Sequence, residues 1–255
     1  MAISRVQLTG GGTSNYDTDV QWTLTLGSSP TVGNTLLIYI NGSSVLNITS
    51  IVQGGSSASW SLLSSSVVAN RNLYIYSLED VPSGSSSSIV INLGTAANWF
   101  CAVAEEISGL ADSSILDQTS TNNGTATNTY STGSTPTTTQ NDEYWVNIYS
   151  AYKAFGSAVQ GSAPTNGYTI ESTVNPVSVF DIGLTPSTPS LGFAPTFSAG
   201  LILAYQIVSS TGTAGGDITD ALSSSSNYNS IAATFKSTSS PPAGPTRRIL
   251  TSSWF

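Results

Sequence analysis

Apolar runs of strand length, separated by clusters of Gly, Pro, Asn and Ser, constrain the fold of this chain more than any other feature. The runs lie at 20–26, 35–40, 46–52, 60–63, 73–78, 89–93, 99–107, 144–151, 168–174, 177–184, 200–208 and 230–235. Short runs of this kind, bounded by turn residues, are typical of β-strands. More than ten of them in one chain predict two packed antiparallel sheets.

We therefore expect an all-β fold, specifically a two-sheet antiparallel β-sandwich of the jelly-roll or elaborated immunoglobulin-like kind. Charged residues make up only 8% of the chain, so the charged and polar helix formers that long amphipathic helices need are scarce. Ser, Thr, Asn and Gly take their place, which suits strands, turns and a neutral surface.

Individual runs predict more specific features. The unbroken apolar run at 35–40 predicts a central strand buried on both faces. The turn signal DVPSG at 80–84 predicts that the strand at 89–93 pairs back onto the strand at 73–78. The Thr/Ser/Asn-rich stretch 119–141 has the composition of a linker, but we favour an exposed hairpin or edge strands, because Thr suits a solvated strand face.

The segments 185–198 and 209–229 are rich in Pro, Ser, Asn and Gly and are expected to be surface loops. The core is expected to contain apolar residues from nine positions in the predicted strands: Trp22, Leu37, Tyr39, Ile75, Val90, Val103, Val146, Leu203 and Phe235. Trp60, Trp99 and Trp145 are expected to be core residues as well.

The charge of the chain disfavours two classes of partner. The net charge is −8, and the only adjacent basic pair is Arg247-Arg248, so neither nucleic acid nor an anionic membrane is an expected partner. No apolar run is long enough for a membrane helix, and the N-terminus lacks the apolar region of a signal peptide. A chain with an extracellular composition and no export signal must leave the cell in another way, and assembly in the cytoplasm followed by lysis is one such route.

Catalysis is disfavoured because the chain has no His, the usual general base. The adjacent carboxylates Glu105-Glu106 and Asp142-Glu143 could serve a glycosidase only if both members of a pair lined one cleft. Neighbouring strand residues point to opposite faces, so we interpret both pairs as solvated turn carboxylates. Cys101 stands alone in an apolar run and is expected to be buried.

Two further groups of residues are candidates for binding. Asp17 with Asp19, or Asp217 with Asp220, could contribute to a Ca²⁺ site, but no known ligand spacing supports one, and no cofactor is predicted. Tyr130, Tyr168 and Tyr228 lie in polar segments and are candidates for exposed rings that stack on sugars or make adhesive contacts.

The chain divides at the end of the last predicted strand. Residues 1–237 are expected to form the sandwich, and residues 238–255 an extended linker followed by a docking arm, with STSSPPAGP at 237–245 as the linker sequence. Aromatic and Arg residues are the types that anchor interfaces. The arm is therefore predicted to bind a partner through six residues, unless it folds back over an edge of its own sandwich: Arg247, Arg248, Ile249, Leu250, Trp254 and Phe255.

Several segments resemble a known kind of module. They are GNTLLIYI, NLYIYSLEDVPSGSSSSIVINL, AVAEEISGL, TTTQNDEYWVNIYS, ILAYQIVSSTGT and IAATFKS. The chain resembles, over roughly residues 30–237, the Ser/Thr-rich β-sandwich modules of tailed-phage virion proteins and of bacterial surface proteins. The resemblance implies a fold and no active site.

Two function hypotheses follow. The first is a non-catalytic virion structural protein, a capsid decoration protein or a tail or fibre component, whose partners are other virion proteins and copies of itself. The second is a carbohydrate-binding or adhesin module of an extracellular bacterial surface protein. A row of exposed aromatic side chains would favour the second.

Overall fold

The computed structural model describes residues 2–13, 20–43, 46–68, 71–95, 100–126, 129–154, 168–170, 197–219 and 226–238. The regular elements in these ranges are all β-strands: β1 Ser4–Thr13, β2 Gln21–Thr25, β3 Thr35–Ser43, β4 Ile48–Gln53, β5 Ser61–Val68, β6 Arg71–Leu78, β7 Ser88–Leu93, β8 Phe100–Ser108, β9 Leu116–Ala126, β10 Thr129–Ser131, β11 Glu143–Ala154, β12 Thr169–Ile170, β13 Phe197–Val208, β14 Asp217–Thr219 and β15 Ser226–Lys236. None of these segments is a helix long and apolar enough to cross a membrane.

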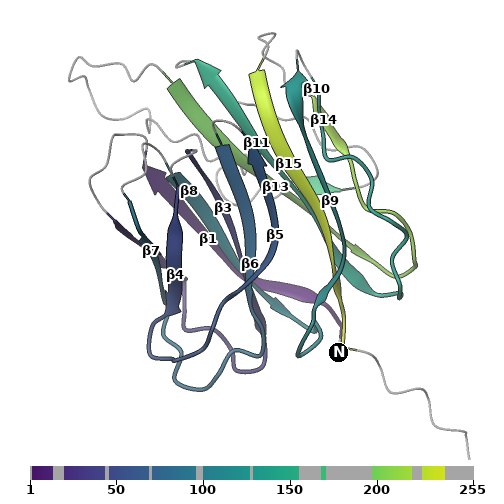
Figure 1. Ribbon diagram of the computed structural model, residues 1–255. Helices are drawn as coiled ribbons and strands as arrows, with labels where there is room; N and C mark the ends of the chain where they lie inside the picture. Colours follow the sequence, from purple (N-terminus) through teal and green to yellow (C-terminus); the bar gives the residue numbers. More distant parts are fainter. Residues whose placement is uncertain are drawn as a thin grey trace, which may run out of the picture.

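The strands form four antiparallel sheets that lie face to face (Figure 1). We name them by their strands: the β3 sheet (β1-β8-β3-β6-β5), the β11 sheet (β12-β13-β11-β15-β9), the β7 sheet (β2-β7-β4) and the β10–β14 ribbon. The β3 and β11 sheets make the predicted antiparallel sandwich, which is confirmed. The β7 sheet covers the far side of the β3 sheet, and the ribbon covers the far side of the β11 sheet.

Each interface between sheets has its own apolar core. The largest lies between the β3 and β11 sheets and contains Leu37, Tyr39, Ile75, Val103, Tyr144, Val146, Leu203 and Phe235 among others. A second lies between the β3 and β7 sheets and contains Leu36, Ile38, Ile40, Ile89 and Ile91. The two cores explain why the run at 35–40 is apolar at every position: β3 is buried on both faces, as predicted.

The core prediction is confirmed for seven of its nine residues, Leu37, Tyr39, Ile75, Val103, Val146, Leu203 and Phe235, which are all buried. Trp22 is only half-buried against the second core. The prediction for Val90 is wrong. The strand β7 turns Ile89, Ile91 and Leu93 toward the β3 sheet, so Val90 points away from it.

Two topological predictions are wrong. The strand β7 pairs with β2 and β4, not with β6, because the turn that contains Val81 carries the chain from the β3 sheet to the β7 sheet. Val81 is fully buried in the second core, which fixes this crossing. The described part of 209–229 includes β14 and the start of β15, so it is not wholly a surface loop.

The polar stretch 119–141 contains an edge strand, as we favoured. β9 is the outermost strand of the β11 sheet and pairs on one side with β15. The strand β1 was not predicted from the sequence at all. The predicted strand at 177–184 and most of the predicted loop 185–198 lie outside the described residues.

Candidate functional site

The predicted docking residues Arg247, Arg248, Ile249, Leu250, Trp254 and Phe255 all lie outside the described residues, as do Asp17, Asp19 and Asp220. Asp217 lies on β14. Within the described part of the chain, no group of three or more His, Cys, Asp or Glu side chains could hold a metal ion.

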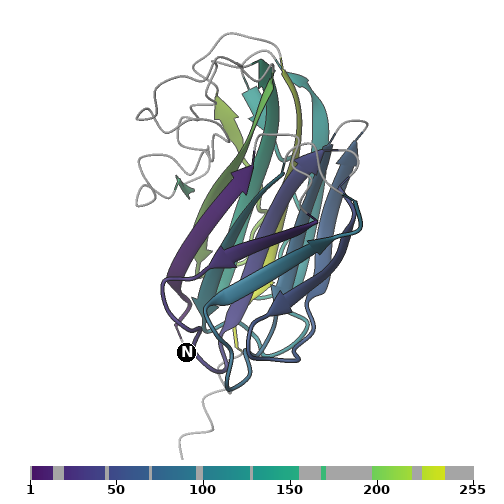
Figure 2. The ribbon, with the colours of Figure 1, turned by 90° about the vertical axis from the view of Figure 1, so that its left-hand side faces the viewer.

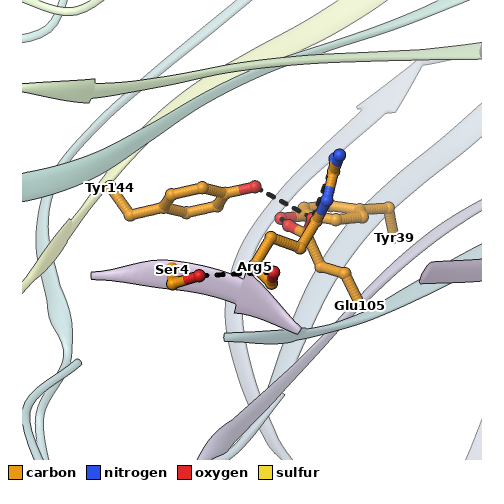
Figure 3. A network of polar contacts seen from close by, with 5 residues as sticks. All are labelled: Ser4, Arg5, Tyr39, Glu105 and Tyr144. Carbon is orange, nitrogen blue, oxygen red and sulfur yellow. Dashed lines mark hydrogen bonds and ion pairs between the residues drawn. The ribbon is translucent and has the colours of Figure 1, made fainter. Parts of the chain in front are cut away.

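Glu105 lies between the β3 and β11 sheets, where its side chain is fully buried. Its carboxylate accepts hydrogen bonds from the phenol of Tyr39 on β3 at 2.5 Å and from that of Tyr144 on β11 at 2.9 Å (Figure 3). Arg5 on β1 places its Nη1 3.9 Å from the same carboxylate. The Arg5 guanidinium also lies 4.5 Å from the centre of the Tyr205 ring. The network joins both sheets of the sandwich through one carboxylate.

Burial and the neighbouring Glu105 carboxylate raise the pKa of both Tyr39 and Tyr144 well above 10. Both phenols therefore stay protonated at neutral pH and donate to the carboxylate. Two phenol donors and one guanidinium thus compensate the charge of Glu105.

Glu106 points to the opposite face of the β3 sheet and is also fully buried. It accepts hydrogen bonds from Gln7 Nε2, from the Thr31 backbone N–H and from Asn34 Nδ2. The interpretation of Glu105-Glu106 as solvated turn carboxylates is thus wrong, while the expectation that they face different sides of the strand holds. Each carboxylate is enclosed in a separate network.

Asp117 and Glu143 form a pair of neighbouring carboxyl groups in a third place. The pKa of Glu143 is raised to about 7 by burial and by the neighbouring Asp117, although Trp145 donates its indole N–H to Glu143 at 2.9 Å. Burial acts to raise the pKa of Asp117, but hydrogen bonds from the backbone and side chain of Thr139 outweigh it and lower that pKa. The pKa values of these two neighbouring carboxyl groups are therefore shifted in opposite directions, upward for Glu143 and downward for Asp117. Asp142 is exposed, as expected of a turn residue, but Glu143 is buried.

The three tyrosines proposed as exposed rings are all buried. Tyr130 and Tyr228 pack edge to face with ring centres 5.2 Å apart, in the core between the β11 sheet and the β10–β14 ribbon. Tyr168 packs against Trp145 in a neighbouring cluster, and its hydroxyl accepts a hydrogen bond from the Gly215 backbone N–H. The ribbon, which the sequence did not reveal, carries Tyr130 and packs it against Tyr228 of the β11 sheet.

Several half-exposed aromatic side chains gather elsewhere, on one face of β5 and β6. We define the tyrosine face as six side chains on the side of β5 and β6 that also carries the β7 sheet. Trp60 directly precedes β5, and the others lie on the two strands: Leu62, Ser65, Val67, Tyr74 and Tyr76. The rings of Tyr74 and Tyr76 lie 6.1 Å apart at 46°. Leu62 is 51% exposed and Val67 is 63% exposed, and both lie on the same side of the sheet as the two rings.

The tyrosine face is exposed because a sheet of three strands cannot cover one of five. The β7 sheet lies over part of the β3 sheet, and the strands β5 and β6 extend beside it (Figure 2). A β-bulge between Leu62 and Ser64 sets which residues are presented. It keeps Leu62 on the same side as Ser65 and Val67, while Ser64 and Ser66 turn inward and are buried.

Trp60 was predicted to be a core residue, and it is instead half-buried against the second core. Trp145 is buried, and Trp99 lies outside the described residues. The alternation Tyr74-Ile75-Tyr76 carries the signal for the face, because β6 places its two tyrosines on one side and Ile75 in the main core. Cys101 is buried, and burial raises the pKa of its thiol to about 12, as expected for a packing residue.

Three comparisons gave no relatives: no family model matches the chain, and neither a curated protein nor a solved structure is significantly similar to it.

Proposed function

We propose that this chain is a non-catalytic structural protein on the outside of a phage particle, either a capsid decoration protein or a tail or fibre component. The observation that supports a binding role is the tyrosine face, an uncharged, largely apolar surface on a protein rich in Ser and Thr. Contiguous exposed apolar patches on soluble proteins are often interaction sites.

The buried carboxyl groups support a role without catalysis. Glu105 and Glu106, the pair that could have served a glycosidase, are enclosed in networks of tyrosine, arginine and amide donors on opposite sides of β8. Such closed networks fix the relative position of strands and sheets. The assignment to a phage particle rests on the resemblance of residues 30–237 to tailed-phage sandwich modules.

The test is to find the protein on particles. Particles are purified by density gradient from a lysate of the host that carries this gene and labelled with gold-conjugated antibody against the recombinant chain. We expect label at the capsid surface or the tail. Label that stays in the soluble fraction, with none on intact particles, would contradict the proposal.

A second function is favoured by the same face: a carbohydrate-binding or adhesin module of a bacterial surface protein. The half-exposed rings of Tyr74 and Tyr76, side by side on a sheet, are the feature that this hypothesis requires. Gold label on the cell envelope rather than on particles would favour this function over the first.

A further inference from the structure

The tyrosine face is built on two paired strands, and its two tyrosine rings are tilted by 46° to one another. In the pairing of β5 with β6, Leu62 lies opposite Tyr76 and Ser65 lies opposite Tyr74. Directly opposed side chains on one face of an antiparallel pair are in contact range. The pairs Leu62–Tyr76 and Ser65–Tyr74 therefore lie side by side, held in place by the sheet itself.

The size of this surface favours a ligand smaller than a folded protein. Side chains of these types and exposures present on the order of 400 Å² of surface. One partner in a standard protein–protein interface buries about twice that area. In area, a short ligand that covers two rings matches the tyrosine face better than a second protein surface does.

The charge around the face limits the ligand further. None of its residues is charged, and the whole stretch 20–70 contains no Asp, Glu, Lys or Arg. The nearest cation in sequence, Arg71, is buried. Since the chain carries a net charge of −8, an anionic ligand would be repelled without a local cation to receive it.

We propose that the tyrosine face binds a neutral oligosaccharide, with pyranose rings stacked on Tyr74 and Tyr76. A pyranose has an apolar C–H face and a rim of hydroxyl groups, and a tyrosine likewise has an apolar ring and a polar tip. The C–H faces pack on the rings, Leu62 and Val67 flank them, and the Ser65 and tyrosine hydroxyls bond to sugar hydroxyls. This inference rests on the proposed function, because a protein on the surface of a particle meets the glycans of a host cell.

The first measurement is binding of the full chain to an array of neutral oligosaccharides with gluco-, galacto-, manno-, xylo- and N-acetylated backbones, with sialylated and uronic acid oligosaccharides alongside. We expect at least one neutral backbone to bind and the acidic ones not to. The best hexasaccharide is then titrated by calorimetry against variants. We expect Y74A and Y76A each to weaken binding at least tenfold.

Two valine variants control for folding. Val67 and Val32 are both more than 60% exposed, and only Val67 is on the tyrosine face. We expect V67K to weaken binding severalfold and V32K to leave it unchanged, with both variants keeping the melting temperature of the unmodified chain. If no neutral backbone binds, if only acidic ones bind, or if the face variants bind as well as the unmodified chain, the inference is wrong. Self-association abolished by V67K, without sugar binding, would instead assign the face to a second copy.

The outcome is separable from that of the proposed function. Particles that carry the Y74A/Y76A double variant are labelled with the same antibody. If the unmodified chain is incorporated into particles but binds no sugar, the sugar site is overturned and the structural role remains. Sugar binding by a chain that is absent from particles would do the reverse.

Discussion

Glu105 shows how a single residue can connect two sheets. Its carboxylate meets phenols from β3 and β11 and the guanidinium from β1, and its side chain has no contact with solvent. In E105Q only one acceptor oxygen remains for two phenols, and Arg5 loses its counter-charge. Because breaking a buried charged network leaves unpaired groups in the core, we expect a loss of about 2–4 kcal/mol in the free energy of unfolding.

Urea unfolding followed by tryptophan fluorescence measures this loss. The matched control is D112N, which makes the same chemical change at an exposed carboxylate. The control should change stability by less than about 0.5 kcal/mol. Equal effects of the two substitutions would mean that the Glu105 network contributes nothing to stability.

Glu143 predicts a pH dependence of opposite sign to that of a salt-bridged carboxylate. Its pKa of about 7 in the folded protein lies above the ordinary 4.5, so between these values the folded state holds a proton that the unfolded state has lost. The resulting stability is complete below pH 4.5 and disappears as the pH rises through about 7. Asp117 acts in the other direction: its lowered pKa contributes stability that is lost only as the pH falls into the acid range.

We therefore expect the melting temperature to fall by several degrees from pH 5 to pH 8. Solvent near Asp117 screens the interaction, so the contribution of Glu143 to the free energy of unfolding is on the order of 1–2 kcal/mol. E143Q cannot ionise and should show a nearly flat profile over this interval. D142N, at the exposed neighbour, should keep the slope of the unmodified chain. A slope unchanged in E143Q would assign the dependence to another group.

At the scale of elements, the β10–β14 ribbon depends on a close approach between two glycines. Gly215 has a φ of 145°, and a Cβ there would overlap the carbonyl oxygen of Gly133. Gly33 also has a positive φ, 83°, but a Cβ there would meet open space. We expect G33A to cost about 1 kcal/mol from backbone strain alone and G215A to cost about 3 kcal/mol or more.

Thermal unfolding of the two variants measures this difference, and limited proteolysis shows where it acts. In G215A the clash should loosen the ribbon, so new cleavage is expected near β10 and β14 while the main core stays protected. Identical melting temperatures for G33A and G215A would show that the ribbon is not held by this contact.

The sequence allowed the strands to be found where their apolar residues are consecutive or alternate, as in β3 and β11. It did not reveal β1, because the bulge between Arg5 and Gln7 breaks the alternation and the strand ends in three glycines. The DVPSG turn has the same local chemistry whether the next strand stays in its sheet or crosses to another. Only the packing of Val81 in the second core decides between these two outcomes.

The candidate site was harder to predict than the strands for a related reason. Exposure of Tyr74 and burial of Tyr130 depend on which sheet covers which, and this is a property of the tertiary arrangement. Polar sequence around Tyr130 suggested exposure, yet its own strand β10 packs this side chain against the β11 sheet; Tyr74 lies in an apolar run, yet the narrow β7 sheet leaves it half-exposed. In both cases the packing of one sheet on another, which the sequence did not reveal, decides the exposure.

For the molecule as a whole, polar contacts cross the main core at several depths. The Ser150 hydroxyl donates to Asn41 at 2.7 Å, the Asn229 amide donates to the Ser66 carbonyl at 2.9 Å, and Tyr144 donates to Glu105. Each contact joins the β3 sheet to the β11 sheet. Because buried polar groups need partners, the two sheets fit in one register only, and the sandwich is held as a single unit.

This unit extends to Thr238, whose backbone N–H donates to the Gly109 carbonyl at 3.0 Å. A chain ending there therefore keeps every bond described above, so removal of residues 239–255 tests the arm alone. If the arm docks on a partner through residues such as Arg247, Trp254 and Phe255, the truncated protein should keep its melting temperature and lose assembly, since truncating an anchor typically costs about 2 kcal/mol or more. R247A/R248A should weaken assembly in the same way. The loss should be larger at low salt, where attraction between the two Arg side chains and carboxylates on the partner is least screened. A lower melting temperature with assembly intact would instead place the arm on an edge of its own sandwich.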